Sequence, residues 1–136
     1  MAKPFHLRVL AMDRAFLEGE CVSLTLPVTD GQLGLMAGHS PIAAAVSPGS
    51  LTARLADGTA ETAVVGHGVV RFENNDALVL VESVERPEEI DARRAAEALE
   101  AAKGELRESG TPRRRLIAAE RVEREQNRLR RAKKAE

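Results

Sequence analysis

Hydrophobic and polar residues alternate along the chain as far as about Val84, which is the pattern of strands that are buried on one face. In Phe5–Val9, the Phe, Leu and Val side chains fall on one face, and His and Arg fall on the other. The alternation recurs in Val22–Leu26 and in Leu51–Leu55. We therefore expect several half-buried antiparallel strands in this part of the chain.

Residues that favour turns separate these strands. The turns are expected at residues 47–49, 56–58, 66–68 and 73–76. No helical pattern follows Gly66–Gly68, so this glycine pair predicts a bulge or a tight turn rather than a phosphate-binding loop. Many short strands at such spacing are typical of a β-sandwich or a flattened barrel.

The composition changes after Pro87, because residues 88–108 contain no proline and a single glycine, and are rich in Ala, Glu, Arg and Leu. Pro87 can open a helix, and Glu88, Glu89 and Asp91 suit the positive end of a helix dipole. Apolar residues then recur at helical spacing and form one narrow stripe, made of Ala95, Leu99, Ala102 and Leu106.

A second helix is expected to follow at once. Gly110 suits the C-cap of the first helix, Thr111 suits the N-cap of the second, and Pro112 suits its first position. One side of this second helix carries Ala118, Val122, Leu129 and Ala132. The predicted fold class is β + α, with an N-terminal antiparallel β-sandwich in residues 1–86 and a C-terminal antiparallel two-helix hairpin in residues 87–136.

The apolar stripes of both helices consist mostly of alanine. At roughly 0.8 kcal/mol per buried CH₂ group, an alanine methyl contributes much less than a leucine side chain. We therefore expect the two helices to pack closely on each other but to dock weakly on the sandwich. An element that is held weakly can occupy two positions at a small cost in free energy.

The amino-acid composition argues against several classes of protein. The chain of 136 residues has three Phe and no Trp or Tyr, which argues against base stacking on aromatic side chains. Cys21 is the lone cysteine, so no internal disulfide can form and a reducing compartment fits best. No secretory signal and no apolar run of bilayer length is evident. We expect a cytoplasmic protein that reaches a membrane only through a partner.

The net charge of −1 hides a basic C-terminal segment, because residues 113–136 carry 10 basic and 4 acidic groups. Arg113, Arg114 and Arg115 lie where the dipole of the second helix disfavours cations. A solvated face, an acidic protein partner and the phosphates of a nucleic acid are the three interpretations. The acids interleaved between the arginines, such as Glu120 and Glu123, argue against a nucleic acid.

Candidate catalytic and metal sites are few. His39 and Ser40 are adjacent, so their side chains point apart on extended backbone, and the G-x-S-x-G turn of serine hydrolases is absent. His6, His39 and His67 are scattered, and with one cysteine they do not form a recognised metal-ligand pattern. We expect neither catalysis nor a metal site.

The segment Leu26–Ile42, with sequence LPVTDGQLGLMAGHSPI, closely resembles the signature of the epsilon subunit of F-type ATP synthases. That signature reads roughly L-P-x-x-D/E-G-x-x-G-x-x-x-G-H-x-P followed by a hydrophobic residue. The opening strand Phe5–Val9, the turn Gly66–Gly68 and the helix start Ile90–Ala95 agree as well. The resemblance extends over nearly the whole chain.

The resemblance implies a non-catalytic rotor subunit that couples rotation of the c ring to ATP synthesis, with a sandwich of about ten strands that contacts the gamma subunit and the c ring. The implied contact residues are Asp30, Gly31, Gln32, Leu33, Gly38, His39 and Pro41. Gln32 replaces an acid found in many relatives, which argues against an ionic contact at that position. The implied location is the cytoplasmic face of a bacterial plasma membrane, reached only through the complex.

In the family, the helical hairpin regulates the enzyme by extending along gamma toward the alpha and beta subunits, where it inhibits ATP hydrolysis. The implied contacts with the acidic surface of beta are Arg113, Arg114, Arg115, Arg121, Arg124 and Arg128.

Some bacterial relatives bind ATP through an Ile/Leu-Asp-x-x-Arg-Ala motif, which Ile90, Asp91 and Arg94 match, with Glu85 about where an acid is expected. A further arginine of these relatives is replaced by Ala101. Asp91 and Arg94, three residues apart, also suit a helix start with an ion pair. ATP as a regulatory ligand is thus one implication, and no other cofactor is implied. An ATP-binding sensor is the alternative function, followed by a protein that binds nucleic acid through its basic helix.

Overall fold

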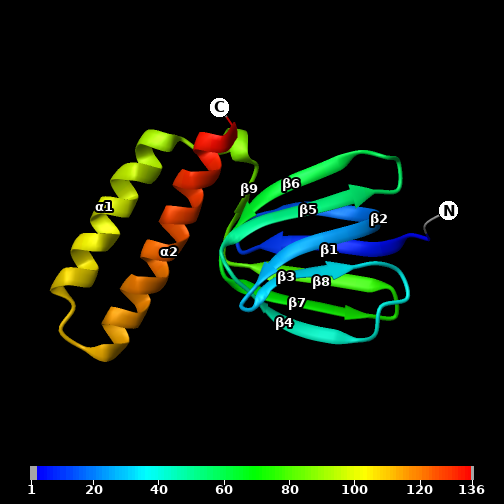
Figure 1. Ribbon diagram of the computed structural model, residues 1–136, viewed down its shortest axis with the longest axis horizontal. Coiled ribbons are helices and arrows are strands. Elements are labelled where there is room, and N and C mark those ends of the chain that lie inside the picture. The colour runs from blue at the N-terminus through cyan, green and yellow to red at the C-terminus, as the bar shows by residue number, and fades with distance from the viewer. Residues whose placement is uncertain (1–2, 136) are drawn as a thin grey trace. The chain divides into compact units, whose positions relative to one another are not determined.

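The computed structural model describes residues 3–135, and the side chains up to Ala132. Its chain forms two compact units that divide between Glu85 and Arg86. The first unit consists of strands and the second of helices (Figure 1).

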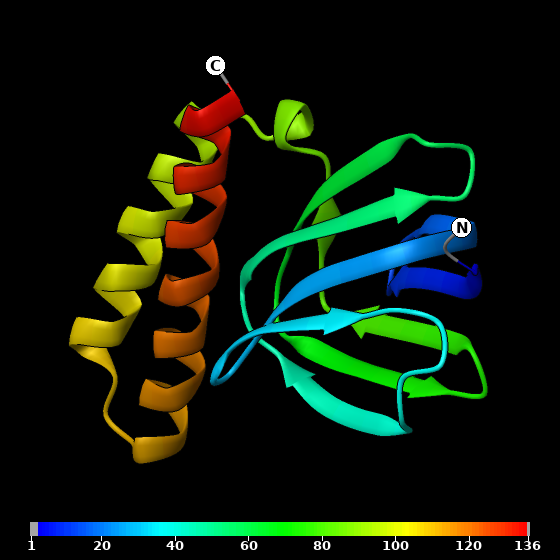
Figure 2. The same ribbon diagram turned by 45° about the vertical axis from the view of Figure 1, so that its right-hand side comes forward.

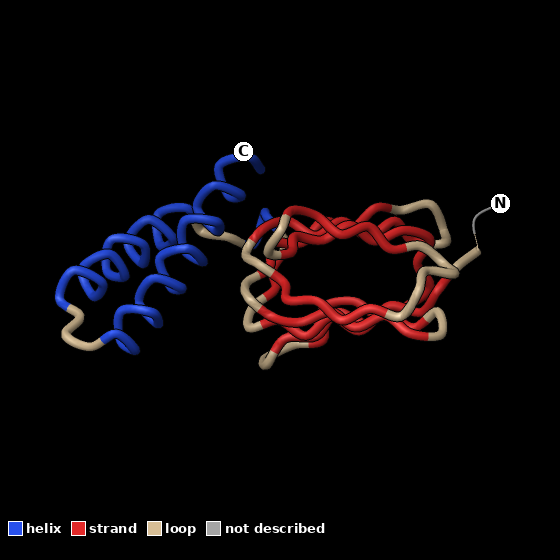
Figure 3. Tube along the Cα trace, turned by 60° about the horizontal axis from the view of Figure 1, so that its bottom comes forward, coloured by secondary structure: helices blue, strands red, loops and turns tan. Residues whose placement is uncertain are grey.

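The strand unit contains nine strands in the described residues. They are β1 (Phe5–Ala11), β2 (Ala15–Val28), β3 (Gly31–Leu35), β4 (Ile42–Val46), β5 (Gly49–Leu55), β6 (Ala60–Val65), β7 (Gly68–Glu73), β8 (Asp76–Val81) and β9 (Val84–Glu85). These strands lie in two layers that face each other (Figure 3). The predicted sandwich is confirmed, although β1 and β8 pair in parallel and all other neighbours are antiparallel.

Strand β2 belongs to both layers. Its first half pairs with β1 as far as Cys21, and its second half pairs with β5 and β3. One layer therefore has the order β2-β1-β8-β7-β4, and the other has the order β3-β2-β5-β6-β9. Each layer contains five strand segments, because β2 is counted in both. The nine strands therefore provide ten segments, which agrees with the expected number of about ten strands.

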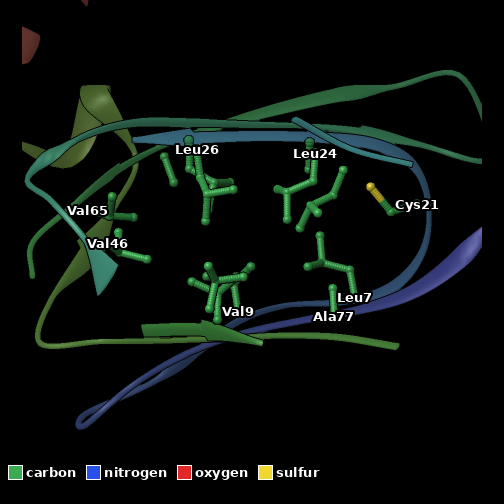
Figure 4. Close-up of a cluster of buried hydrophobic side chains, with 14 of the residues drawn as sticks. Leu7, Val9, Cys21, Leu24, Leu26, Val46, Val65 and Ala77 are labelled. Atoms are coloured by element: carbon green, nitrogen blue, oxygen red, sulfur yellow. The ribbon is translucent and has the colours of Figure 1, made fainter. Parts of the chain in front are cut away.

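The core lies between the layers and is filled by the inward side chains that the alternation predicts. Leu24 and Leu26 come from one layer, and Leu7 and Val9 come from the other (Figure 4). Cys21 lies where β2 passes between the layers, and its Sγ–H donates to the Ser23 carbonyl at 3.0 Å. Burial raises the pKa of the Cys21 thiol, so this side chain stays protonated at neutral pH and acts as a small core residue.

Two of the predicted turns are tight hairpins. Asn74 and Asn75 connect β7 to β8 with φ of 53° and 56°, the left-handed conformation that a two-residue hairpin turn of type I′ requires. Asp57 precedes Gly58, which has φ of +95°, and its Oδ1 accepts hydrogen bonds from the Thr59 N–H and Oγ1–H at 2.9 and 2.6 Å. These bonds hold the pKa of the Asp57 carboxyl below its usual value.

The Gly66–Gly68 segment is a tight connection between β6 and β7, as predicted. A Cβ on Gly68 would lie 2.0 Å from the Leu80 carbonyl oxygen, and one on Gly66 would lie 2.6 Å from Oε1 of Glu82. Gly68 is required because the backbone of Leu80 and Val81 approaches too closely for any larger residue, whereas the atoms next to Gly66 belong to side chains that can shift. Backbone packing therefore accounts for Gly68.

The helical unit contains a 3₁₀ turn η1 (Pro87–Glu89), α1 (Ala92–Glu108) and α2 (Pro112–Ala135). Pro87 opens a helix as expected, but this helix is the 3₁₀ turn η1 and not α1, because the extended backbone of Ile90 separates the two. Asp91 is instead the N-cap of α1, and its Oδ1 accepts from the Arg93 and Arg94 N–H groups at 3.0 and 3.2 Å.

The connection between the helices differs from prediction at one end only. The Gly110 cap is wrong, since α1 ends at Glu108 and Ser109 is its C-cap in an extended conformation. The Ser109 N–H donates to the Leu106 carbonyl. At the start of α2, the Thr111 Oγ1 accepts from the Arg114 N–H at 3.2 Å and Pro112 is the first residue, as predicted.

The alanine-rich stripes are buried only in part, because Leu106, Val122 and Leu129 are half-buried. The buried residues of the stripes are Ala95, Leu99 and Ala102 in α1, and Ala118 and Ala132 in α2. The sequence pattern did not predict that Glu125 and Asn127 of α2 are also buried, with exposed fractions of 5% and 4%.

We predict that Gly68→Ala lowers the free energy of unfolding by about 1–3 kcal/mol, because the new Cβ overlaps the Leu80 carbonyl. Gly19→Ala is the matched control, since nothing lies within 4 Å of its Cβ position. The control should change the stability by less than about 0.5 kcal/mol. Urea unfolding followed by circular dichroism measures both, and equal midpoints for the two variants would contradict the prediction.

Candidate interaction surfaces

The segment that carries the epsilon signature forms the end of β2, a hairpin turn, β3 and a loop. Val28 pairs with Gly31 across the turn, and Gly31 has φ of +134°, a conformation that favours glycine. Asp30, Gly31 and Gln32 are exposed. Leu33 is half-buried and packs against the core. The turn thus presents a short polar surface on a rigid hairpin.

The predicted contact residues lie in two groups. Asp30, Gly31, Gln32 and Leu33 lie at the beginning of β3, and Gly38, His39 and Pro41 follow its end (Figure 2). The five residues of β3 span about 13 Å at 3.3 Å per residue, so the strand holds the groups apart. We therefore treat the two groups as separate surfaces.

The second group is built on a tight turn over residues 36–39, which we call the His39 turn. The His39 N–H donates to the Met36 carbonyl at 3.1 Å. Gly38 occupies the third position of the turn with φ of +86°, which is the geometry of a type II turn. Met36 is an exposed apolar side chain, with an exposed fraction of 57%. The backbone of the turn therefore favours glycine at this position, and the turn leaves Met36 exposed and His39 half-buried.

Two contacts orient the imidazole of His39. Its ring lies edge-on to Phe72, with ring centroids 5.9 Å apart and an interplanar angle of 76°. Its Nδ1 lies 2.7 Å from the Ser40 carbonyl oxygen. A carbonyl only accepts, so Nδ1 carries the proton, and Nε2 of the neutral ring is left as an acceptor. The partner atom in this contact is the Ser40 carbonyl oxygen and not its hydroxyl.

A further surface was missed by the sequence analysis. Leu10, Leu80, Val69 and Ala45 are successive cross-strand neighbours on the outer face of β1, β8, β7 and β4, and we call them the apolar row. The exposed fractions are 54% for Val69 and 43% for Leu80. The sequence contains a sign of this surface, because Ala77–Val81 is apolar at every position and does not alternate. Such a run indicates that both faces of β8 carry apolar side chains.

The neighbouring row on that outer face is mixed and consists of Arg8, Leu78, Arg71 and Ala43. Two arginines therefore border the apolar row. Arg8 of β1 pairs with Asp76 of β8 at 3.7 Å. His6 lies 3.4 Å from a carboxylate oxygen of Glu18 on β2. An apolar strip with a charged border is the usual composition of a protein-interaction surface.

The six candidate arginines of α2 fall into two sets. Arg113, Arg114 and Arg115 are exposed in the first turn, where no acidic residue accompanies them. The other three are engaged inside the helical unit. Arg121 forms an ion pair with Glu105 of α1, and Arg124 and Arg128 lie 3.6 and 3.0 Å from carboxylate oxygens of Glu125.

The residues of the ATP-binding motif have structural roles. Ile90 is buried, and Asp91 caps α1. Arg94 is exposed, with its Nε 3.8 Å from Oδ2 of Asp91. Glu85 ends β9 in the strand unit. Capping and a surface ion pair account for the motif, and ATP binding stays a prediction.

Within residues 3–135, no three His, Cys, Asp or Glu side chains are grouped so that they could hold a metal ion. Among the described helices, none combines the length and the apolar character that crossing a bilayer requires.

A β-sandwich followed by a helical hairpin, with exposed apolar and charged surfaces, is the architecture of a protein that binds other proteins. Comparison with known families agrees, because residues 4–87 match the beta-sandwich domain of the ATP synthase Delta/Epsilon chain. The ATP synthase epsilon chain of Streptomyces avermitilis is 37% identical over 105 residues, which cover 77% of this chain and 85% of the relative. The chloroplastic epsilon chain of Jasminum nudiflorum is 36% identical over 125 residues, which cover 92% and 93%.

Solved structures share the fold. A chain in the central stalk and c-ring structure of Tetrahymena thermophila mitochondrial ATP synthase superimposes with a TM-score of 0.69 at 15% identity, covering 98% of this chain and 97% of that one. A chain of Euglena gracilis mitochondrial ATP synthase gives a TM-score of 0.74 at 21% identity, covering 91% and 78%. The protein described here belongs to the delta/epsilon family of ATP synthases as an epsilon chain, which is a non-catalytic subunit.

We predict that neutral His39 is protonated on Nδ1, because the Ser40 carbonyl requires a donor there. Nitrogen-15 chemical shifts of labelled histidine, recorded at a pH where the ring is neutral, measure the tautomer. Nε2 should show the shift of an unprotonated ring nitrogen. A protonated Nε2 beside an unprotonated Nδ1 would contradict the orientation that we describe.

Proposed function

We propose that this chain is a central-stalk subunit of an F-type ATP synthase, in which the sandwich couples the c ring to gamma and the helical hairpin inhibits ATP hydrolysis. The observation that carries the proposal is the identity of more than a third with epsilon chains over 105 residues. The proposed site of action is the cytoplasmic face of a bacterial membrane, which the subunit reaches through the complex alone.

The two ends of β3 support two separate contacts. The turn at Asp30, Gly31 and Gln32 is exposed and polar, which suits the polar loops of a c ring. At this position a neutral Gln32 offers hydrogen bonds and no charge. The His39 turn and the apolar row are the surfaces that we assign to gamma, because an apolar strip with a charged border suits a lasting contact between subunits.

The helical hairpin has the energetics of a mobile element. The side chains that it buries are mostly alanine, so little apolar surface would be lost if the helices separated from their neighbours. The ion pair between Arg121 and Glu105 joins α1 to α2 and is partly exposed, which limits its contribution to about 1 kcal/mol. The folded hairpin is thus held by several weak interactions, and a second conformation of similar free energy is within reach.

The arginine sets suggest an order of events. Arg113, Arg114 and Arg115 are exposed before any rearrangement and oppose the helix dipole, so an acidic surface on beta would relieve an existing conflict. Arg121, Arg124 and Arg128 must first leave Glu105 and Glu125. In the proposed mechanism the first set makes the initial contact with beta.

We predict that removal of residues 88–136 raises the rate of ATP hydrolysis by F1 severalfold and leaves the sandwich bound to gamma. The reason is that the core of the strand unit contains no residue beyond Val84. Steady-state hydrolysis and copurification with gamma measure the two effects. An unchanged hydrolysis rate in complexes that retain the shortened chain would show that the hairpin does not inhibit.

We also predict that replacing Arg113, Arg114 and Arg115 together by Gln weakens inhibition. Exposed ion pairs contribute about 0.2–1 kcal/mol each, so loss of three should weaken the inhibited state roughly tenfold. Arg93→Gln is the control, because it removes an exposed cation from α1. The measurement is the hydrolysis rate at two salt concentrations. Equal inhibition by the triple variant and the control would exclude these arginines from the contact.

A further inference from the structure

Asn75 joins three segments of the strand unit that are far apart in sequence. Its carbonyl oxygen accepts from the His6 N–H of β1 at 2.9 Å. Its side-chain Oδ1 accepts from the Gly38 N–H at 2.8 Å. Asn75 itself lies in the turn between β7 and β8, and so connects this turn both to β1 and to the His39 turn.

The bond to Gly38 satisfies a donor that the His39 turn leaves free. In a turn of this type, the internal hydrogen bond joins the first carbonyl to the fourth N–H, here Met36 and His39. The N–H of the third residue, Gly38, points away from that bond and needs another partner. Asn75 is the partner, so it fixes the position of the turn relative to the sandwich.

The left-handed backbone of Asn75 explains why this residue type serves the purpose. Its φ of 56° belongs to the hairpin turn, a conformation that Asn tolerates better than most residues. Glycine would also adopt this backbone but has no acceptor, and Asp would keep both properties. Asn74 has nearly the same φ of 53° in the same turn. Both asparagines adopt the left-handed backbone, but Asn75 is the one that accepts the hydrogen bond from Gly38. Substitutions at the two positions can therefore distinguish the effect of the backbone from the effect of the hydrogen bond.

We propose that Asn75 is a positioning residue, which holds the His39 turn in the orientation that its partner subunit recognises. This inference rests on the proposed function for the identity of the partner subunit. The hydrogen bond itself can be tested in the isolated chain, without a partner. The mechanism is pre-organisation: a turn that is already fixed loses less conformational freedom on binding. His39 adds to the same arrangement through its edge-on contact with Phe72, a residue of β7 next to the same hairpin.

The test uses the full chain with Asn75→Gly, Asn75→Asp and Asn74→Gly. The first readout is amide hydrogen exchange at Gly38 in the isolated protein. Asn75→Gly removes the acceptor and should speed exchange about fivefold, the effect of losing one hydrogen bond of roughly 1 kcal/mol. Asn75→Asp and Asn74→Gly should match the unsubstituted chain. Unchanged exchange in Asn75→Gly would overturn the proposal.

The second readout is affinity for the alpha–beta–gamma complex of the same host, measured beside the melting temperature. Asn75→Gly should bind about fivefold more weakly, with Asn75→Asp restoring the affinity. Equal affinity of Asn75→Gly and the unsubstituted chain would overturn the positioning role, as would a loss shared by Asn74→Gly. If the unsubstituted chain does not bind, the proposed function fails, and the exchange measurement still decides whether Asn75 holds the turn.

Discussion

The continuity of β2 through both layers is the constraint on which the rest of the strand unit depends. Because one strand of 14 residues pairs with β1 by its first half and with β3 and β5 by its second, the two layers cannot separate without breaking it. The same strand leads directly into the hairpin with β3. The signature segment therefore continues from the core of the sandwich, which explains how short polar turns can keep a fixed geometry.

The course of β2 also determines where the exposed surfaces of the strand unit lie. β3 holds the turn at Asp30 and the His39 turn at its two ends, while the apolar row lies across the other layer. The strand unit thus offers several rigid surfaces that face in different directions, which is what the proposed coupling role requires. The helical unit has the opposite character, with an alanine-rich seam, partly exposed ion pairs and unsatisfied cations at the start of α2. We therefore assign the proposed coupling to the strand unit and the proposed regulation to the helical unit.

The sequence predicted the features that depend on local pattern. Alternation located the inward side chains, Asn74 and Asn75 indicated their turn, and Thr111 and Pro112 located the start of α2. The errors arose where a capping interaction decided the outcome. The helix α1 begins after its N-cap Asp91 and not at Pro87, and its C-cap is Ser109 and not Gly110. The apolar row and the bond between Asn75 and Gly38 depend on strand register and on contacts between residues 37 positions apart, which no local pattern encodes. The resemblance named the His39 segment but gave no indication that its residues lie at the opposite end of β3 from Asp30.

The most direct test is to tag this chain at its own locus, purify it from detergent-solubilised membranes of its host and identify its partners by mass spectrometry. If the sandwich connects the gamma subunit to the c ring, then the gamma, c, alpha and beta subunits should be recovered with it in constant proportion. Recovery of the tagged chain without gamma, while the ATP synthase of the same cells carries a different epsilon chain, would contradict the account.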